Sequence, residues 1–417
     1  MSVFKPFAAW RPHPEFVEQV AALPYDVMSS EEARQMVAGK PWSFLHVDKP
    51  EIDMDPGIDL YDARVYQQAR TNLQRMMEAK ILLMEEQPCY YIYRQRMGDH
   101  VQTGLAGVVS IDDYINNIVK KHEFTRPDKE ADRTRHVDIC DAQTGPIFLS
   151  YRTDELLRDC LRHWTDNHDP LYEIDGGDGV LHIIWRVDEA DAIDFIKERF
   201  AAIPYLYIAD GHHRAASAVN VGKQRREQQS HYHGDEAFNF FMAVSFPADE
   251  LQIFDYNRLV KDLNGYEAEE LLSQIAAVGF KVLPWAAPEH CRPPRRHNFG
   301  LYLKGRWYLV EALPEVIDES DPVAGLDVSI LQDKILAPLL GIDDPRTSQR
   351  IDFVGGIRGL DELVRRVDSG EMEMAFAMYP TGMAELMAIA DAGAVMPPKS
   401  TWFEPKLRSG IFIHGLK

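Results

Sequence analysis

The residues best suited to chemistry stand in one short stretch, Asp210-Gly211-His212-His213-Arg214. An apolar run precedes it and an alanine-rich run follows it, which predicts a buried strand, a tight turn at Gly211 and a helix that begins near His212. The unpaired backbone N–H groups of a helix start favour an anion such as phosphate, and Arg214 adds guanidinium donors. Asp210 then stands beside that anion as a metal ligand or a proton acceptor.

A structural explanation of this stretch stays open beside the functional one. An aspartate before a helix is commonly its cap, and consecutive histidines at a helix start are often surface residues. The crowding of two imidazoles and one guanidinium onto a single turn favours the functional explanation.

A second candidate region is the charged segment 120–136, which has almost no apolar residue and is therefore predicted not to be buried as a regular element. A solvated helix face or a loop explains such a segment equally well. The segment also combines the carboxylate of Glu123 with the cations Lys121 and Arg126. Phosphoryl transfer needs this mixture, because a base must accept the hydroxyl proton and cations must neutralise the phosphate oxygens.

The proline-rich tail over residues 396–406 is the third candidate region, and it is predicted not to form a regular helix. It supplies two ammonium groups and two hydroxyls, from Lys399, Ser400, Thr401 and Lys406. The tail could fold back onto an anion, or it could be packed on the surface without contacting one.

The stretch 210–214 resembles the Asp-Gly-His-His-Arg motif of the ParB/sulfiredoxin-like free serine kinases, and Lys121-His122-Glu123 is similar to the segment that holds their general base. The whole chain also resembles a large prokaryotic family that carries the same motif in a longer protein. That wider likeness includes residues 24–27, 43–47, 145–146, 150–151 and 399–403.

The resemblance implies a role for each candidate residue. Glu123 and Asp210 are the expected catalytic residues, and Asp210 is also the expected metal ligand. The expected phosphate or donor contacts are Gly211, His212, His213, Arg214, Lys121, Arg126, Lys399, Ser400, Thr401 and Lys406.

By the same resemblance, the protein is expected to transfer a phosphoryl group to the hydroxyl of free L-serine, giving O-phosphoserine. The donor stays open between ATP, ADP and pyrophosphate; the absence of a Walker A or kinase glycine-loop signature favours pyrophosphate slightly. Mg²⁺ is expected as a shield for the donor phosphates. The alternative function is that of a ParB-like nucleotide-binding regulatory or DNA-associated protein without kinase activity. Sulfiredoxin-like reduction is disfavoured because position 212 is histidine where that chemistry needs cysteine.

Composition limits the partners and the compartment. A formal net charge of −21 argues against binding to nucleic acid and to anionic membranes. The four cysteines, Cys89, Cys140, Cys160 and Cys291, show neither a zinc spacing nor a disulfide framework. We therefore expect a cytoplasmic protein whose partners are small molecules, and the oligomeric state stays open, with a homodimer one option.

The expected fold is mixed α/β (α+β) with several domains, because 417 residues exceed one ordinary core. We predict a helical N-terminal segment over 1–88, a central ParB/sulfiredoxin-like catalytic domain with a mixed sheet over 89–247, and an α/β domain over 248–417 that ends in the phosphate-contacting tail. The pattern predicts helices over 59–83, 112–121, 154–168, 188–200, 267–278, 328–340 and 383–390. It predicts hairpins that pair 90–93 with 105–111, 171–174 with 180–185, and 301–303 with 307–310.

Overall fold

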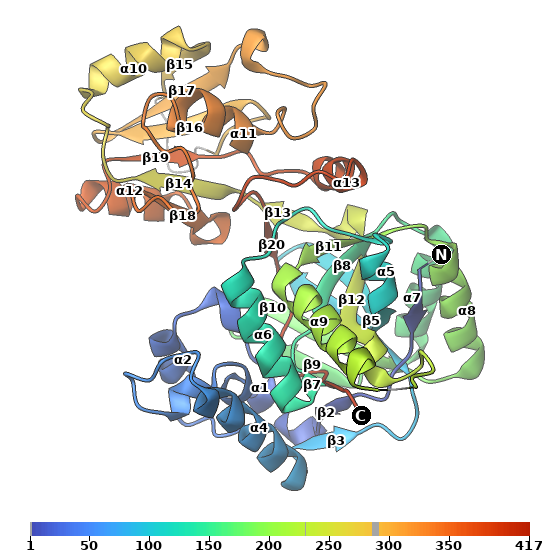
Figure 1. Cartoon of the computed structure of the whole chain (residues 1–417). Coiled ribbons are helices and arrows are strands. Elements are labelled where there is room, and N and C mark those ends of the chain that lie inside the picture. The colour runs from blue at the N-terminus through green and yellow to red at the C-terminus, as the bar shows by residue number, and fades with distance from the viewer. Residues whose placement is uncertain (1, 230, 286–291) are drawn as a thin grey trace. The chain divides into compact units, whose positions relative to one another are not determined.

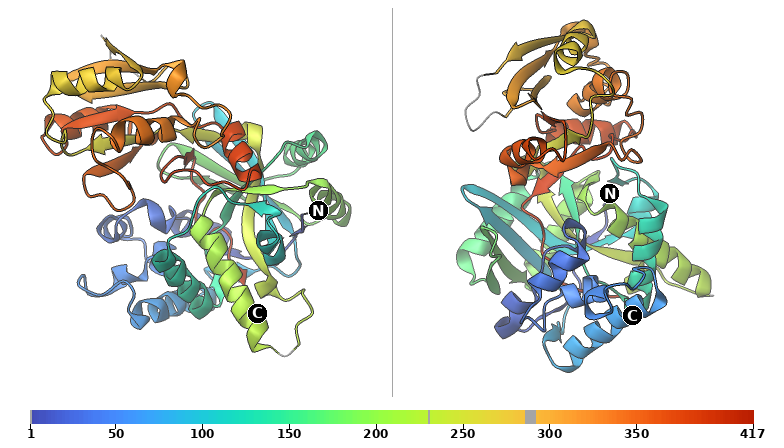
Figure 2. Two further views of the ribbon diagram at one scale, coloured as in Figure 1. Left: turned by 45° about the horizontal axis from the view of Figure 1, so that its top comes forward. Right: turned by 90° about the vertical axis from the view of Figure 1, so that its left-hand side faces the viewer.

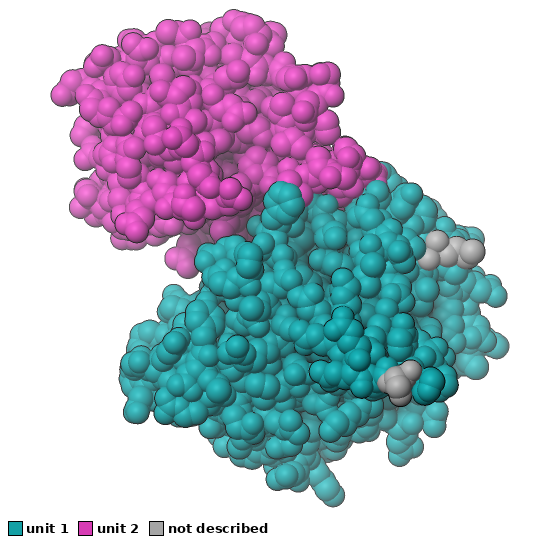
Figure 3. Space-filling model, in the orientation of Figure 1, with its two compact units in different colours: residues 1–251, 405–417 teal, residues 252–404 magenta. Residues whose placement is uncertain are grey.

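The computed structural model describes residues 2–229, 231–285 and 292–417, so Cys291 lies outside the described residues. The chain forms two compact units, one made of Met1–Leu251 with Pro405–Lys417 and the other of Gln252–Glu404 (Figure 3). We call them unit 1 and unit 2. The other three cysteines are free thiols.

These units differ from the three predicted domains at both ends of the chain. Residues 1–88 do not stand apart from 89–247, because Leu45 and Leu73 share one apolar core with Cys140 and with Ile413 of the tail. The residues after Glu404 return to unit 1, where Ile413 pairs with Trp10. The sequence does not reveal this return, because it depends on contacts between residues far apart in the chain.

The described residues of unit 1 form a nine-stranded mixed sheet, which confirms the predicted mixed α/β class (Figure 1). β11 pairs in parallel with β6 and antiparallel with β8, while β12 pairs in parallel with β8 and antiparallel with β5. In spatial order the strands are β6 (Val119–Lys120), β11 (Leu206–Asp210), β8 (Ile147–Tyr151), β12 (Phe240–Pro247), β5 (His100–Ser110), β4 (Tyr90–Met97), β10 (Val180–Val187) and β9 (Tyr172–Asp175), with β1 (Phe4–Lys5) beside β5. The short pairs β2 (Trp10–Pro12) with β3 (Leu82–Met84) and β7 (Ala142–Gln143) with β21 (His414–Gly415) lie outside this sheet.

Helices of unit 1 pack against the large sheet and complete its hydrophobic core. Leu161 of α7, Phe200 of α8 and Ala218 of α9 share one core with the large sheet. α6 and α9 lie side by side in both further views (Figure 2). The helices are α1 (Val17–Val20), α2 (Ser30–Met36), α3 (Leu45–Asp48), α4 (Ala63–Glu78), α5 (Ile111–Ile115), α6 (Pro127–Cys140), α7 (Glu155–Asn167), α8 (Ala190–Ala202) and α9 (His212–Gln228).

Most local predictions for unit 1 are confirmed, and two differ. The hairpins β4–β5 and β9–β10 form as predicted, as do α7 and α8. The helix predicted over 59–83 is shorter, because it ends at Glu78 and β3 follows. The helix predicted over 112–121 ends at Ile115, since Val119 and Lys120 pair with β11 as β6.

The prediction that segment 120–136 is not buried as a regular element was wrong. Its second part forms α6, in which His136 is 2% exposed. Few apolar side chains of α6 are buried, and the polar groups on its inner face have partners on other elements. Asp132 accepts a hydrogen bond from the Tyr66 hydroxyl at 2.7 Å, and Glu130 accepts one from the Asn220 amide at 2.7 Å.

Unit 2 contains a six-stranded sheet of its own among the described residues. The predicted hairpin of β16 and β17 is present, whereas β18 and α12 were not predicted. The helix predicted over 328–340 is α11 followed by a π-helical turn, η7. The elements are β13 (Gln252–Phe254), β14 (Tyr256–Val260), α10 (Ala268–Ala277), β15 (Phe280–Pro284), β16 (Asn298–Leu303), β17 (Arg306–Ala312), α11 (Asp327–Leu331), η7 (Gln332–Leu336), β18 (Ile351–Gly355), α12 (Asp361–Asp368), β19 (Met374–Ala377), α13 (Met383–Asp391) and β20 (Trp402–Glu404). Within the described ranges, no helix is long and apolar enough to cross a membrane.

Candidate functional site

The turn between β11 and α9 has the geometry that the sequence predicts. Gly211 is the N-cap residue of α9 and adopts φ 92°, a left-handed conformation that glycine tolerates without strain. Among the described residues no side chain caps the helix. The Asp210 carboxylate accepts a hydrogen bond from the Gly211 N–H at 2.8 Å and does not cap α9. The alternative in which Asp210 is an ordinary helix cap is therefore not realised. The first-turn N–H groups of α9 are left for another acceptor.

Two cations flank the Asp210 carboxylate. The Lys406 ammonium lies 3.2 Å and an Arg214 guanidinium nitrogen 3.9 Å from its Oδ2 atom. Burial alone would raise the pKa of Asp210, but Lys406 and Arg214 outweigh burial and hold that pKa well below its usual range. Asp210 is therefore a carboxylate at neutral pH and a weak base, which suits it better to charge stabilisation than to proton abstraction.

Arg214 is held by residues from two distant segments. One of its guanidinium nitrogens donates to the Pro146 carbonyl at 2.5 Å, and another lies 3.7 Å from the Asp26 carboxylate. The side chain is 12% exposed, and its Nε atom has no hydrogen-bond partner among the described residues. Asp26 and Pro146 belong to segments that the family resemblance picked out, but their contact with Arg214 was not predicted.

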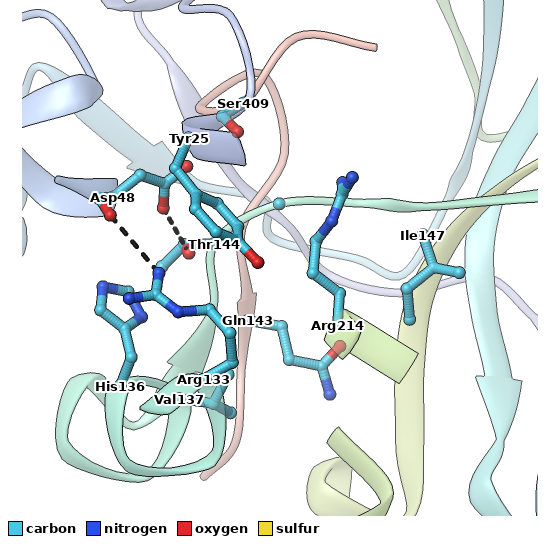
Figure 4. A pocket seen from close by; sticks show the side chains of 11 residues that line it. Tyr25, Asp48, Arg133, His136, Val137, Gln143, Thr144, Ile147, Arg214 and Ser409 are labelled. Atoms are coloured by element: carbon cyan, nitrogen blue, oxygen red, sulfur yellow. Dashed lines mark hydrogen bonds between the residues drawn. The ribbon is translucent and has the colours of Figure 1, made fainter. Parts of the chain in front are cut away.

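Arg214 lines one side of a small cavity (Figure 4). The other lining residues include Tyr25, Asp48, Arg133 and Thr144. The Thr144 hydroxyl donates to the Asp48 carboxylate at 2.6 Å, and an Arg133 nitrogen donates to the Asp48 carbonyl at 3.4 Å. The Arg133 guanidinium also lies 4.4 Å from the centre of the Tyr25 ring. With about 30 Å³ of space accessible to water, the cavity has room for ordered water beside Arg214. Sequence reasoning missed it, because Arg133 was one cation among many in a charged segment.

Glu123 lies at the other side of the turn. Its Oε2 atom is 3.9 Å from Nδ1 of His212, and its side chain is 45% exposed. The rings of His122 and His212 meet edge to face with their centres 4.5 Å apart. Burial lowers the pKa of His122 to about 4 and that of His212 well below its usual range, so both imidazoles are neutral at neutral pH. The Nε2 atom of His212 is buried and has no partner within the described part of the chain.

Other predicted donor contacts lie further from Asp210 or have other partners. The Lys121 ammonium lies 4.2 Å from the centre of the Tyr114 ring, and burial lowers its pKa. Arg126 is 68% exposed and binds Asp128 at 2.8 Å. His213 is half-buried, and its Nδ1 atom has no partner among the residues described.

The predicted tail contacts divide between the two units. Lys406 belongs to unit 1, whereas Lys399, Ser400 and Thr401 belong to unit 2. In unit 2 the Ser400 hydroxyl donates to the Pro397 carbonyl at 2.6 Å. Unit 1 by itself therefore brings together Asp210, Gly211, His212, Arg214, Lys406 and, beside His212, Glu123.

A magnesium ion fits these residues only together with phosphate. No group of three or more His, Cys, Asp or Glu side chains in residues 2–229, 231–285 and 292–417 could hold a metal ion by itself. Mg²⁺ is, however, commonly bound by one or two carboxylates and the phosphate oxygens of a substrate. Asp210 could supply such a carboxylate, provided that Lys406 leaves its Oδ2 atom.

Comparisons with known proteins give one family and several distant structures. No curated protein matches the chain by sequence. Among solved structures, a free serine kinase in complex with AMP is 13% identical and covers 73% of this chain and 90% of its own, with a TM-score of 0.36. A conserved hypothetical protein from Pyrococcus furiosus is 14% identical with coverages of 73% and 93%, and SbnI from Staphylococcus aureus is 12% identical with coverages of 72% and 82%; both have TM-scores of 0.36. The model of the family described as "Protein of unknown function (DUF1015)" matches residues 4–329, which is more than half of the chain, and the protein therefore belongs to the DUF1015 family.

Proposed function

We propose that the protein is a small-molecule phosphotransferase that transfers a phosphoryl group to the hydroxyl of free L-serine. The observation that supports this proposal most is the uncapped start of α9 at Gly211, with Arg214 and Lys406 beside it. Backbone N–H groups at a helix start and two nearby cations form a site suited to phosphate. The choice of serine as acceptor rests on the motif resemblance alone.

The donor phosphates would accept hydrogen bonds from the first-turn N–H groups of α9, with Arg214 and Lys406 neutralising their charge. Arg214 is suited to a fixed contact, because Pro146 and Asp26 already orient its guanidinium. Mg²⁺, when bound with the phosphates, would shield their charge further, and Asp210 is the residue that would hold it.

Glu123 is the proposed general base. In the transfer step the serine hydroxyl proton goes to the Glu123 carboxylate and the serine oxygen forms a bond to phosphorus. The bond between phosphorus and the bridging oxygen of the donor breaks, and its electron pair leaves with the nucleotide or phosphate. His212 is neutral and lies 3.9 Å from Glu123, so it can orient the carboxylate without competing for charge.

The test is a donor panel. Purified protein is incubated with L-serine, MgCl₂ and either ATP, ADP or pyrophosphate, and phosphoserine is measured by mass spectrometry. We expect product with at least one donor, and pyrophosphate is our first choice. A reaction without serine measures donor hydrolysis. If no donor gives phosphoserine and the protein instead binds DNA in a nucleotide-dependent manner, the ParB-like regulatory function replaces this proposal.

A further inference from the structure

The residues after unit 2 form an extended segment that returns to unit 1, and we call Pro405–Lys417 the C-terminal strap. Ser409 pairs with Ala22, and Ile413 pairs with Trp10, as isolated β-bridges. Backbone groups of other segments hold the strap at Ser409, Ile413 and Leu416, whereas side chains hold its backbone at Lys406 and Arg408. Lys406, the residue beside Asp210, is its second residue.

The backbone at Lys406 is fixed by a glutamine pair on β4 and β5. The Gln95 amide donates to the Lys406 carbonyl at 2.9 Å, and the Gln102 amide donates to the Gln95 side-chain oxygen at 2.9 Å. Both glutamines are fully buried. A buried glutamine is costly unless its polar atoms have partners, so this pair specifies where the strap carbonyl must lie.

Two residues further on, Arg408 joins a buried polar cluster that the proposed chemistry does not use. Its Nε donates to Nε2 of His182 at 3.1 Å, and an Nη nitrogen lies 2.5 Å from the Asp178 carboxylate. The Tyr93 hydroxyl lies 2.9 Å from Nδ1 of His182 and accepts the Arg408 backbone N–H at 3.2 Å. Because Nε2 accepts, Nδ1 of His182 carries the proton and the imidazole is neutral. Tyr93 and His182 are fully buried, and Arg408 is 5% exposed.

We propose that Arg408 is a positioning residue whose contacts with His182 and Asp178 fix the strap so that the Lys406 ammonium lies ready at the phosphate site. A lysine side chain has many rotamers, and a mobile backbone would disperse the ammonium further. With the strap fixed at the Lys406 carbonyl and at Arg408, only the Lys406 side chain needs to be ordered when a phosphate binds. That the ligand is a phosphate rests on the proposed function, whereas the effect of Arg408 on the position of Lys406 does not.

A double-mutant cycle tests that link. Binding of inorganic pyrophosphate is measured by calorimetry for wild type, Arg408→Met, Lys406→Met and the double variant. We expect Arg408→Met to weaken binding about tenfold, the effect of one lost charge-assisted contact. In the Lys406→Met background the same change should cost less than twofold, because the residue on which Arg408 acts is then absent. Arg96→Met is the charge control, since Arg96 is an exposed arginine on β4. Equal losses in both backgrounds would overturn the proposal.

A second measurement does not depend on phosphate. The Lys406 side chain is only 11% exposed and is paired with Asp210, so an amine-acylating reagent should modify it slowly in wild type. Arg408→Met should raise the rate about tenfold, as judged by peptide mass spectrometry, and Arg96→Met should not. If wild type binds none of pyrophosphate, ATP and ADP, the proposed function fails, and an unchanged acylation rate in Arg408→Met would separately refute the positioning role. If Arg408→Met does not fold, Asp178→Asn tests the same cluster, with a rise of about threefold expected.

Discussion

Replacement of Gly211 by alanine tests whether the turn is the phosphate site. The residue has φ 92°, and a Cβ atom there would lie 3.1 Å from Nε and 3.2 Å from Cζ of Arg214. The left-handed conformation costs an alanine about 1–2 kcal/mol. The guanidinium must also move by several tenths of an ångström, although the Pro146 carbonyl holds it at 2.5 Å. Gly211→Ala should therefore lose stability and disturb the cation that faces the helix start.

Gly234 provides a matched control. Its φ of 91° imposes the same strain on an alanine, and nothing lies within 4 Å of the added Cβ atom. Urea unfolding should show a loss of about 1–2 kcal/mol for Gly234→Ala and a larger one for Gly211→Ala. Pyrophosphate affinity should fall about tenfold in Gly211→Ala alone, because a displaced guanidinium loses one charge-assisted hydrogen bond. If Gly211→Ala binds pyrophosphate as wild type does, phosphate does not bind at this turn.

Three further changes test separate parts of unit 1. Glu123→Gln should lower kcat about 10²–10⁴-fold in the serine assay, whereas Asp128→Asn, an exposed acid of the same segment, should change it little; equally mild effects would exclude Glu123 as the base. Thr144→Val leaves the Asp48 carboxylate without its donor and should cost about 1–3 kcal/mol in urea unfolding, and no loss would mean that water replaces the hydroxyl. Burial lowers the pKa of His414 to about 4, so the unfolded chain binds its proton first as pH falls below 6.5. Stability should thus decline toward pH 5 by about 2 kcal/mol from this residue, and His414→Gln should flatten the slope of unfolding free energy against pH.

Local features of the site could be predicted from the sequence because they depend on neighbouring residues. The apolar run before Asp210 and the alanines after His213 define a strand and a helix, and only glycine suits the turn between them. The charged segment misled the prediction for the opposite reason. Some of its polar side chains are partly buried in α6, because Tyr66 and Asn220, far away in sequence, provide hydrogen-bond partners.

The long-range features of the site could not be predicted from spacing. Asp26, Pro146 and Lys406 reach Arg214 and Asp210 from three separate segments of unit 1. The tail was a predicted phosphate contact as a whole, but it divides after Glu404, and only Lys406 lies in the unit that contains the turn. Which tail residue would meet the turn depends on where the strap packs, and no local pattern encodes that.

Glu130 shows how the structure changes the choice of a control. Glu130 lies in the same charged segment as Glu123, so by sequence alone it matches the proposed base in charge. Its carboxylate, however, accepts hydrogen bonds from Thr125 at 2.6 Å and from Asn220 of α9 at 2.7 Å, so it joins the segment to the helix that begins at the turn. A loss of activity in Glu130→Gln would therefore report displacement of α9 as well as loss of charge. Asp128, whose carboxylate pairs with the exposed Arg126, avoids this ambiguity.

The two cations around Asp210 differ in a way that bears on how a donor would enter. Arg214 is fixed by a backbone carbonyl and a second carboxylate, so it can contact phosphate without moving. Lys406 has a fixed backbone but a flexible side chain, and its ammonium is a compact point charge with rotatable donors. In the proposed function, an arriving phosphate would draw this ammonium from Asp210 while the Lys406 backbone stays held by Gln95. In the proposed function this exchange would free Oδ2 of Asp210, the residue that would hold Mg²⁺ together with the donor phosphates. A lysine at position 406 would therefore suit the proposed site both with and without bound phosphate, whereas an arginine held by two partners would suit only one of these states.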